Sequence, residues 1–473
     1  MSPRRLLSLL LAALAAVLLA SGPASAAAPS LAVSGNRLVD STSGSAFVPR
    51  GVNWPSFEYA CYYGYGYSNE AGAESVGPTD QQARLIASWH ANVVRVPLNQ
   101  DCWLGDDGRP AGGLDAAGYR DAVAAWVDKL HVAGLAVILD LHWSGPDGVP
   151  AEGQRMLADD RSPAFWSSVA ARFRDDRAVI FDAFNEPYSR TYDDGGPTFA
   201  LDWTCWRDGG CPAPRQNDES GPFDGQTFTV VGMRALVQAI RDAGAKQPIM
   251  LGGLDYANDL RGWLDARPDD DQLVASFHNY AAQRCSTAAC WDAEIAPVAA
   301  QVPVVTGEFG ETDCRETHDR RYMAWADARG IGYLAWQWVV LAPNERPTPA
   351  CSGLALIDDI HGTPASPNGT ALKEHLAQVA SGDRRAPRPT RLRLSRTGRA
   401  LVLRLTLDEP ASVRATVRRS GRRATVVTKR LGRGSRALTL VRRPARGRYR
   451  VSVTATDAAG NRSPARSVSA TVR

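Results

Sequence analysis

Short apolar runs alternate with longer amphipathic segments along most of the chain. Eight of these runs have the length and apolar content of buried strands. They cover residues 48–53, 92–97, 136–142, 179–186, 248–252, 274–280, 304–308 and 333–338. Helical spacing is found between them at residues 79–91, 116–133, 226–243 and 319–329, and Asp115 is placed to cap the second of these helices.

Eight strands that alternate with helices over about 330 residues are typical of a (β/α)8 TIM barrel, an α/β fold. The alternative is a doubly wound open sheet. The first strand is not followed by a Gly-rich phosphate loop, which disfavours that alternative. Residues 35–48 alternate weakly around Ser and Gly turns and predict a short hairpin ahead of the barrel.

The pattern changes in the last part of the chain. Segments 401–407, 412–417, 437–441 and 449–455 are short and alternating, and turn signals separate them. This is typical of a small all-β sandwich of the immunoglobulin-like or fibronectin-type-III-like kind. We therefore expect a barrel domain at residues 27–382, a Pro/Arg-rich linker at 383–390 and a β-sandwich module at 391–473.

The N-terminus predicts secretion. Arg4 and Arg5 precede an apolar run that ends in Ala24-Ser25-Ala26, a small-residue cleavage pattern. Residues 1–26 therefore have the features of a signal peptide. An uncleaved anchor is the alternative, but the run of about 15 residues is too short to span a bilayer comfortably. We expect an extracellular monomer, free or associated with the cell wall, without membrane contact after cleavage.

The formal net charge of +4 is the sum of two opposite charges. Residues 382–473 contain 25 Lys and Arg against 4 Asp and Glu, and the rest of the chain contains 29 against 46. Such asymmetry marks domains with different surfaces. The basic module is expected to be a solvated spacer or to contact an anionic cell-wall polymer. Nucleic acid is disfavoured because Tyr449 is the only aromatic residue of the module and no nucleic-acid-binding motif is present.

Candidate chemistry lies at the predicted strand ends, where barrel enzymes carry their catalytic groups. The residues there are Arg95, His142, Trp143, Asn185, Glu186, His278, Tyr280, Glu308, Trp336 and Trp338. Glu186 and Glu308, on the fourth and seventh strands, face each other across such a barrel. Glycosidic cleavage requires one carboxylic acid to protonate the leaving oxygen and one carboxylate to attack the anomeric carbon. Arg95 is the candidate cation that keeps one of them ionised.

On these residues the sequence resembles glycoside hydrolase family 5, the cellulase-type retaining enzymes with a (β/α)8 fold. The resemblance covers roughly residues 31–380. Its most specific motif is Phe-Asn-Glu-Pro at residues 184–187. His-x-Tyr at 278–280, Gly-Glu-Phe-Gly at 307–310 and the Trp of the last strand follow in the expected order.

The resemblance implies a role for each residue of the motifs. Glu186 would be the acid/base and Glu308 the nucleophile of a double displacement. Asn185 would bond the hydroxyl next to the reacting carbon, and Arg95 and Tyr280 would hold Glu308. His142 and His278 would line the subsite of the cleaved bond, and Trp336 would stack on the sugar. No metal and no cofactor is implied.

The expected substrate is a β-linked polysaccharide cleaved by endo action. Cellulose-type β-1,4-glucan is the leading candidate, with β-mannan or another β-glucan as the alternative. The alternative from another class is a non-catalytic cell-wall carbohydrate-binding protein on the same scaffold. Several Trp residues at or after strand ends favour a saccharide cleft, because sugar faces pack on aromatic planes. Trp54, Trp143 and Trp338 are the further candidates for sugar stacking.

The eight cysteines predict disulfides. An even number in a secreted chain without any CxxC motif favours bridges over a metal cluster. Barrel geometry places two pairs after neighbouring strands and two pairs within single loops. The predicted bridges are Cys61–Cys102, Cys205–Cys211, Cys285–Cys290 and Cys314–Cys351. They would stiffen long loops on the face that carries the candidate site.

Overall fold

The computed structural model describes residues 28–64, 67–68, 75–105, 115–193, 195–382, 386–419, 425–456 and 462–472. The predicted signal peptide and the first three residues of the predicted linker lie outside this part of the chain. Within the described residues, no helix is both long enough and apolar enough to cross a membrane.

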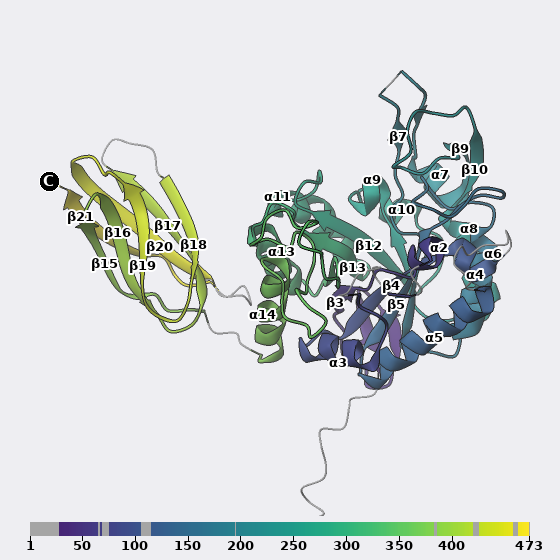
Figure 1. Ribbon diagram of the computed structural model, residues 1–473, viewed down its shortest axis with the longest axis horizontal. Helices are drawn as coiled ribbons and strands as arrows, with labels where there is room; N and C mark the ends of the chain where they lie inside the picture. Colours follow the sequence, from purple (N-terminus) through teal and green to yellow (C-terminus); the bar gives the residue numbers. More distant parts are fainter. Residues whose placement is uncertain are drawn as a thin grey trace, which may run out of the picture.

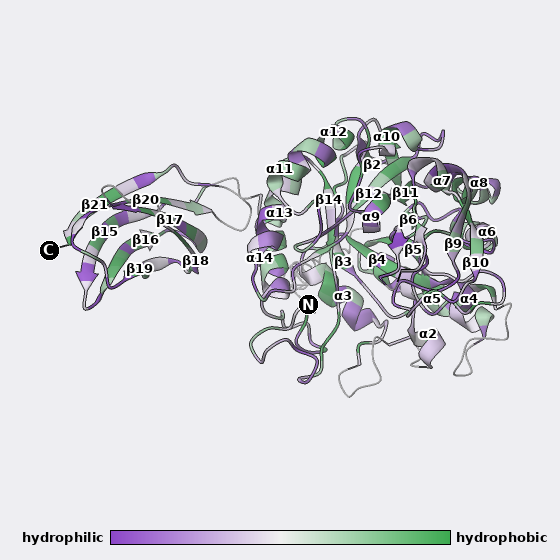
Figure 2. Cartoon of the chain, turned by 90° about the horizontal axis from the view of Figure 1, so that it is seen from above, coloured by the Kyte–Doolittle hydropathy of each residue, from purple (hydrophilic) through white to green (hydrophobic). Residues whose placement is uncertain are grey.

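Eight parallel strands close into a barrel, as the alternating pattern predicts, and helices surround it (Figure 1). The strands are β3 (Arg50–Asn53), β4 (Val93–Asn99), β5 (Ala136–Trp143), β6 (Val179–Asp182), β11 (Ile249–Gly252), β12 (Leu273–Tyr280), β13 (Val304–Gly310) and β14 (Gly332–Ala335). They pair in this order, and β14 pairs with β3 to close the barrel. Figure 2 shows these strands as the predominantly hydrophobic centre of the larger domain.

The longer helices of the barrel domain pack against its outside (Figure 1). They are α3 (Asp80–Ser88), α5 (Ala116–Val132), α6 (Ser162–Phe173), α8 (Met233–Asp242), α13 (Thr317–Asp327) and α14 (Asn368–Ala380). Thr79 and Asp115 cap α3 and α5 by accepting hydrogen bonds from the backbone amides of Gln82 and Gly118. The first turns of these two helices are thus satisfied by residues adjacent to them in sequence.

One predicted helix starts too early. The helix expected at residues 226–243 is a strand, β10 (Thr227–Val231), followed by Gly232 and then α8. The strand is rich in β-branched residues and pairs antiparallel with β9 (Gly209–Pro214). A tertiary partner that the local pattern does not reveal therefore overrides the helical spacing there.

The hairpin of β1 (Leu31–Ser34) and β2 (Arg37–Asp40) closes the N-terminal end of the barrel. Leu31 and Leu38 pack on inward-facing strand residues such as Val93 and Ile138. Backbones approach closely at this end, since a Cβ on Gly51 would lie 1.8 Å from the carbonyl oxygen of Val93. The sealed end leaves the opposite, C-terminal end of the strands for chemistry.

An insertion between β6 and α8 rises above that C-terminal end (Figure 1). It contains β7 (Arg190–Thr191), β8 (Thr198–Phe199), α7 (Trp203–Asp208), β9 and β10. The disulfide Cys205–Cys211 joins α7 to β9. The insertion follows directly after the Asn-Glu-Pro motif, so it forms part of the surroundings of Glu186.

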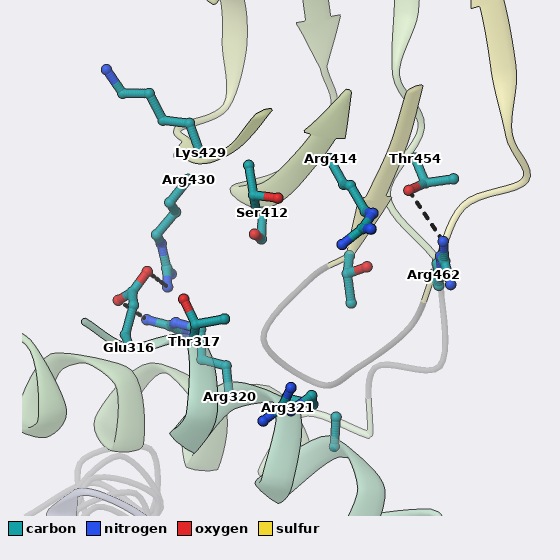
Figure 3. Close-up of a pocket in the computed structure, with 13 residues that line it drawn as sticks. Glu316, Thr317, Arg320, Arg321, Ser412, Arg414, Lys429, Arg430, Thr454 and Arg462 are labelled. Carbon is teal, nitrogen blue, oxygen red and sulfur yellow. Dashed lines mark hydrogen bonds and ion pairs between the residues drawn. The ribbon is translucent and has the colours of Figure 1, made fainter. Parts of the chain in front are cut away.

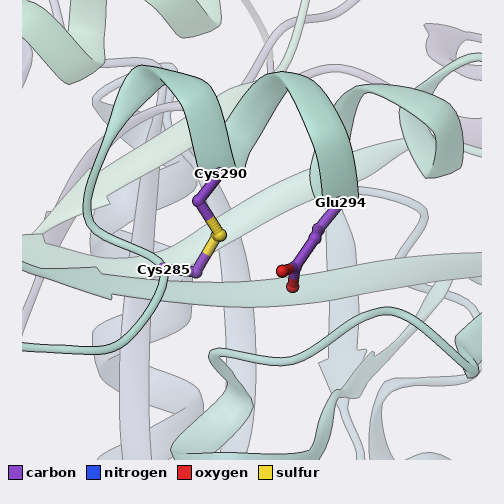
Figure 4. A group of neighbouring side chains, drawn as sticks. All are labelled: Cys285, Cys290 and Glu294. Atoms are coloured by element: carbon purple, nitrogen blue, oxygen red, sulfur yellow. A yellow bond between two sulfur atoms is a disulfide. The ribbon is translucent and has the colours of Figure 1, made fainter.

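All four disulfides pair as predicted. They are Cys61–Cys102, Cys205–Cys211, Cys285–Cys290 and Cys314–Cys351. Figure 4 shows Cys285 and Cys290 beside Glu294, a trio whose potential ligand atoms lie within 4.8 Å of one another. The two sulfurs are bonded to each other, so neither is a thiolate that could bind a metal ion.

The C-terminal module is all-β. One sheet has the order β15-β16-β19 and the other β18-β17-β20-β21. Their bounds are β15 (Thr390–Thr397), β16 (Ala400–Leu407), β17 (Ala411–Arg419), β18 (Thr425–Leu431), β19 (Gly434–Arg442), β20 (Gly447–Thr456) and β21 (Arg466–Val472). Alternating residues of both sheets, such as Leu403, Val413 and Val451, form a separate buried core. The outer faces of β15, β17 and β20 carry most of the outward-facing arginines of these strands.

Candidate active site

Arg95 on β4 lies fully buried at the centre of the C-terminal end of the barrel. Its guanidinium donates hydrogen bonds to Asp182 at 2.9 Å, to Asn53 at 3.1 Å, to Asn185 at 2.7 Å and to Glu308 at 2.8 Å. Asp140 completes the set with an ion-pair distance of 3.0 Å. The acceptors come from β3, β5, β6, β13 and the turn after β6, so one side chain ties five segments together.

The cluster around Arg95 contains more carboxyl groups than cations. Asp140, Asp182 and Glu308 surround a single guanidinium, and the two aspartates are fully buried. Burial raises the pKa of both aspartates above the ordinary value, although the charge of Arg95 opposes this. A buried cluster of this kind avoids excess negative charge because its carboxyl groups retain a proton near neutral pH.

Glu308 on β13 is held by donors at both carboxylate oxygens. Arg95 Nη1 donates to Oε1 at 2.8 Å, and the Tyr280 hydroxyl on β12 donates to Oε2 at 2.6 Å. Only 4% of the residue is exposed. A charged donor and a neutral donor, one at each oxygen, fix the orientation of this carboxyl group.

Glu186 has different surroundings. It follows β6, and its Oε1 lies 2.7 Å from Nδ1 of His278 on β12. Burial raises the pKa of Glu186 to about 7, while the hydrogen bond from Gln154 and the charge of Arg95 act in the opposite direction. Among the described residues, Arg95 forms a hydrogen bond and ion pair with Glu308 but none with Glu186. The two glutamates thus have the divergent environments that separate an acid from a nucleophile.

His142 and His278 are neutral at neutral pH. Burial lowers the pKa of His142 to about 4 and that of His278 to about 3. His142 Nδ1 lies 2.6 Å from Asp140, which orients the ring. The indole of Trp336 stacks on this imidazole, with ring centroids 5.5 Å apart and planes inclined by 7°.

Trp143 is a second half-buried aromatic residue at this end of the barrel. Its ring centroid lies 6.3 Å from that of Tyr59 and 6.1 Å from that of Tyr63, which is 52% exposed. Aromatic side chains are therefore accessible at the mouth of the barrel, next to the buried polar cluster.

Two of the predicted stacking residues are in the core instead. Trp54 and Trp338 are both 0% exposed. Trp54 packs on Trp126 of α5, and Trp338 packs on Trp89 and donates its indole N–H to Gln82. Their position at strand ends is as expected, but each ring points outward between the barrel and its helices. Neither can stack on a sugar.

Gln154 is a site residue that the sequence reasoning missed. Its amide nitrogen lies 3.3 Å from Oε2 of Glu186, and its amide oxygen accepts a hydrogen bond from Asn185. It lies in the loop after β5, outside any strand end, and nothing in its local sequence distinguishes it. Only the folded loop brings it against the Asn-Glu pair.

Tyr256 approaches the same motif from the loop after β11. Its ring stacks on Tyr188 with centroids 4.9 Å apart, and its amide donates to the carbonyl of Pro187. Asp255, Tyr256 and Ala257 all have positive φ between 55° and 56°. Three successive residues in this region are costly, and such backbone is found mainly at functional sites.

Glu186, His278 and Glu308 also offer three potential metal-ligand atoms within 4.8 Å of one another. Glu308, however, already receives the guanidinium of Arg95 and the hydroxyl of Tyr280. A metal cation would have to share this carboxylate with a buried guanidinium less than 3 Å away. The donor set therefore fits two interacting carboxyl groups better than a metal centre.

Comparison with known proteins agrees with this geometry. The family profile described as cellulase (glycosyl hydrolase family 5) matches residues 50–340. A mannan endo-1,4-β-mannosidase of Streptomyces lividans is 26% identical over 329 residues, which are 67% of this chain and 68% of that protein. A xyloglucan-specific endo-β-1,4-glucanase of Bacteroides ovatus is 37% identical over 81 residues, 15% of this chain and 16% of that protein.

Solved structures share the fold. The β-glucanase SdGluc5_26A of Saccharophagus degradans superposes with a TM-score of 0.54 at 17% identity, covering 76% of this chain and 96% of that one. The same enzyme in complex with cellotetraose gives a TM-score of 0.53 at 18% identity, with the same coverage. These similarities concern the barrel fold.

The Arg95 cluster makes a prediction about stability. Replacing the cation by an isosteric apolar side chain, Arg95→Met, leaves buried carboxylates without a counter-charge and should cost about 3–5 kcal/mol near pH 8. The carboxyl groups then have still higher folded-state pKa values, so the variant loses more stability than the wild type as pH rises. The measurement is the thermal unfolding midpoint at pH 5 and pH 8.

Arg172→Met is the control, because Arg172 forms an exposed pair with Asp121 on the barrel surface. It should cost at most about 1 kcal/mol at either pH. An equal loss at both pH values for Arg95→Met would contradict the assignment of raised pKa values to this cluster.

Proposed function

The chain belongs to glycosyl hydrolase family 5 and is a glycoside hydrolase, and from this we propose that it is a retaining endo-β-glycosidase. Glu308 is the nucleophile and Glu186 the acid/base. The observation that carries the proposal is the separation of the two carboxyl groups, which bring oxygens within 4.8 Å of each other. Retaining enzymes have carboxyl groups about 5–5.5 Å apart, whereas inverting enzymes need about 6.5–9.5 Å to admit a water molecule.

The proposed reaction has two displacements. Ionised Glu308 attacks the anomeric carbon while protonated Glu186 gives its proton to the leaving glycosidic oxygen, and a glycosyl-enzyme forms. Glu186, now ionised, then takes a proton from water as that water attacks the anomeric carbon. The sugar leaves with retained configuration, and both glutamates return to their starting states.

The surroundings of the two glutamates support this division of roles. Arg95 and Tyr280 hold the two oxygens of Glu308 in place, and burial favours the protonated form of Glu186. Asn185 is held by Arg95 and Gln154, which suits a donor or acceptor aimed at the hydroxyl beside the reacting carbon. The ring of Trp336 stacks on that of His142, and we propose that the indole packs on the sugar in the subsite of the cleaved bond.

The proposed substrate is a β-1,4-linked polysaccharide, with β-1,4-glucan first and β-mannan second. The aromatic residues at the barrel mouth support a saccharide ligand, and Trp143 and Trp336 are the half-buried tryptophans available there. The relative from Streptomyces lividans, which is named as a mannan endo-1,4-β-mannosidase, favours the second candidate. Sugar configuration at the carbon next to the reacting centre distinguishes the two.

We also propose that the protein acts outside the cell after removal of residues 1–26. The charged and apolar pattern of those residues supports export. Four disulfides support an oxidising compartment. The mature chain would then comprise the barrel domain and the basic module.

Substitution of the two glutamates tests the mechanism. Glu308→Gln should lower kcat/KM on soluble β-1,4-oligosaccharides by about 10⁴-fold or more, with an unchanged unfolding midpoint. Glu186→Gln should hydrolyse the same substrates more slowly. It should still form the glycosyl-enzyme rapidly from an aryl glycoside whose leaving group needs no protonation. Azide should then restore turnover of the Glu186 variant and yield a β-glycosyl azide, because it attacks without general-base help.

The first product of the wild type, followed by NMR, should have the β configuration. An α-configured first product would refute retention. If the wild type were as inert as Glu308→Gln on glucan, mannan, xylan and β-1,3-glucan, the proposed enzymatic activity would be refuted. The alternative, a non-catalytic carbohydrate-binding protein, would then be favoured.

The pH profile tests the state of Glu186. Because the first step needs its proton, kcat/KM should fall as pH rises through about 7, the pKa of Glu186. The hydrogen bond from Gln154 lowers that pKa, so Gln154→Leu should move the falling limb to higher pH. Gln238→Leu, which removes an exposed bond to Asp242 on α8, is the control and should leave the limb in place. An unmoved limb in Gln154→Leu would contradict the positioning role.

A matched pair of substrates tests the choice of sugar. We expect kcat/KM on β-1,4-gluco-oligosaccharides to exceed that on β-1,4-manno-oligosaccharides of equal length by about tenfold or more, the scale of one lost sugar–protein hydrogen bond. The reverse order would make the protein a β-mannanase. Endo action predicts that the viscosity of a soluble polymer falls early, before reducing ends accumulate.

A further inference from the structure

A basic cleft lies between the barrel and the C-terminal module, away from the candidate active site. Its volume is about 590 Å³. One wall is the N-terminal half of α13, and the other is the outer face of the four-stranded sheet, as Figure 3 shows. The lining cations are Arg320, Arg321, Arg414, Lys429, Arg430 and Arg462. Among the described lining residues, Glu316 is the single carboxylate.

Strand alternation explains why this face of the module is polar. Ala411, Val413 and Ala415 of β17 point into the core, so Ser412 and Arg414 point outward. Register then sets hydroxyls beside the cation. Arg414 lies opposite Thr428 of β18 and Thr454 of β20.

The two carboxylates near the cleft already form ion pairs with arginines. Glu316 and Glu374 of α14 both pair with Arg320, at 2.9 and 2.8 Å, and both also pair with Arg430. These pairs join the module to the barrel. They leave the positive charge of the other lining cations in excess.

Arg414 and Lys429 form no ion pair with any described residue. On the barrel side, Arg321 donates to the carbonyl of Ser286 and lies 5.3 Å from the ring centroid of Trp291, neither of which neutralises its charge. Arg462 reaches only the hydroxyl of Thr454 within the described part of the module. The cleft thus concentrates cations from both domains around one cavity.

We propose that this cleft binds an acidic polysaccharide, a chain that carries a carboxylate on its sugar rings. Arginine pairs with carboxylates through two parallel hydrogen bonds, and the interleaved Ser and Thr hydroxyls match the hydroxyls between charges on such a chain. Aromatic residues are absent from the described lining of the cleft, so neutral sugars and single-stranded nucleic acid lack a stacking platform. The ligand bridges both domains and holds the enzyme at a wall that contains it, raising the local concentration of catalytic sites.

Binding of oligogalacturonate to the full-length mature chain tests the proposal, with isothermal calorimetry at low ionic strength. The double substitution Arg414→Gln/Arg462→Gln should weaken binding by about tenfold. The barrel-side substitution Arg321→Gln should weaken it by about threefold. Added salt should weaken binding by the wild type, since the attraction is between charges.

The control is Arg393→Gln/Arg404→Gln, which removes the same charge from the outer face of the other sheet, where these two residues are paired neighbours. It should leave affinity unchanged. Equal weakening by both double variants would show diffuse attraction to net charge and overturn the proposal. Unchanged affinity in Arg321→Gln would overturn the two-domain cleft and leave the module alone as the binding surface.

Two further measurements distinguish acidic polysaccharide from other anionic ligands, and binding at the cleft from hydrolysis at the candidate active site. Tighter binding of inorganic polyphosphate or single-stranded DNA than of oligogalacturonate would overturn the acidic polysaccharide as ligand. Glu308→Gln should bind oligogalacturonate as the wild type does, and the cleft variants should hydrolyse a soluble neutral β-1,4-oligosaccharide normally. Loss of binding and loss of hydrolysis are therefore distinguishable outcomes.

Discussion

The candidate active site depends on the buried guanidinium of Arg95. It donates to acceptors from five segments, and three of these acceptors are carboxyl groups. A buried cation of this kind is costly unless it is fully paired, and buried carboxylates are costly without it. The barrel brings them together, so each compensates the desolvation of the other. Residues far apart in the sequence thereby acquire one fixed geometry.

From that geometry follows the difference between the two glutamates. Both lie at strand ends around the same axis, yet Glu308 receives Arg95 and Tyr280 whereas Glu186 faces the neutral His278 and the amide of Gln154. Position alone would make the two carboxyl groups equivalent. Their partners differ, and burial raises the pKa of Glu186. Unlike surroundings of this kind are the condition for dividing acid and nucleophile in glycoside cleavage.

Charge also determines how the C-terminal module attaches to the barrel and which surface it presents. Its outward-facing residues are set by strand alternation, and its attachment to α13 and α14 uses two shared carboxylates. The positive charge that remains lies beside the barrel, on the flank of the molecule rather than at its catalytic end. Catalysis and anchoring would then be served by separate surfaces of one chain.

Much of this organisation is predictable from local sequence. Apolar runs along the sequence predict the buried parallel strands. This places Arg95 within β4, Glu308 within β13 and Glu186 just after β6, and barrel topology is enough to pair the cysteines correctly. Local spacing predicts a helix from residue 226, but residues 227–231 form a strand, because pairing with β9 outweighs that spacing. Trp54 and Trp338 were expected in the cleft and are core residues, because a strand end does not determine which way a ring points.

The sequence by itself determined the barrel, the all-β module and the residue types at the strand ends, since these follow from periodicity and short-range preferences. Only the tertiary structure decided what each residue touches. Gln154 joins Asn185 and Glu186 from a loop without a motif, and the basic cleft takes one wall from each domain. Burial and hydrogen bonding set the ionisation of carboxyl groups, and both are properties of three-dimensional neighbours rather than of neighbours along the chain.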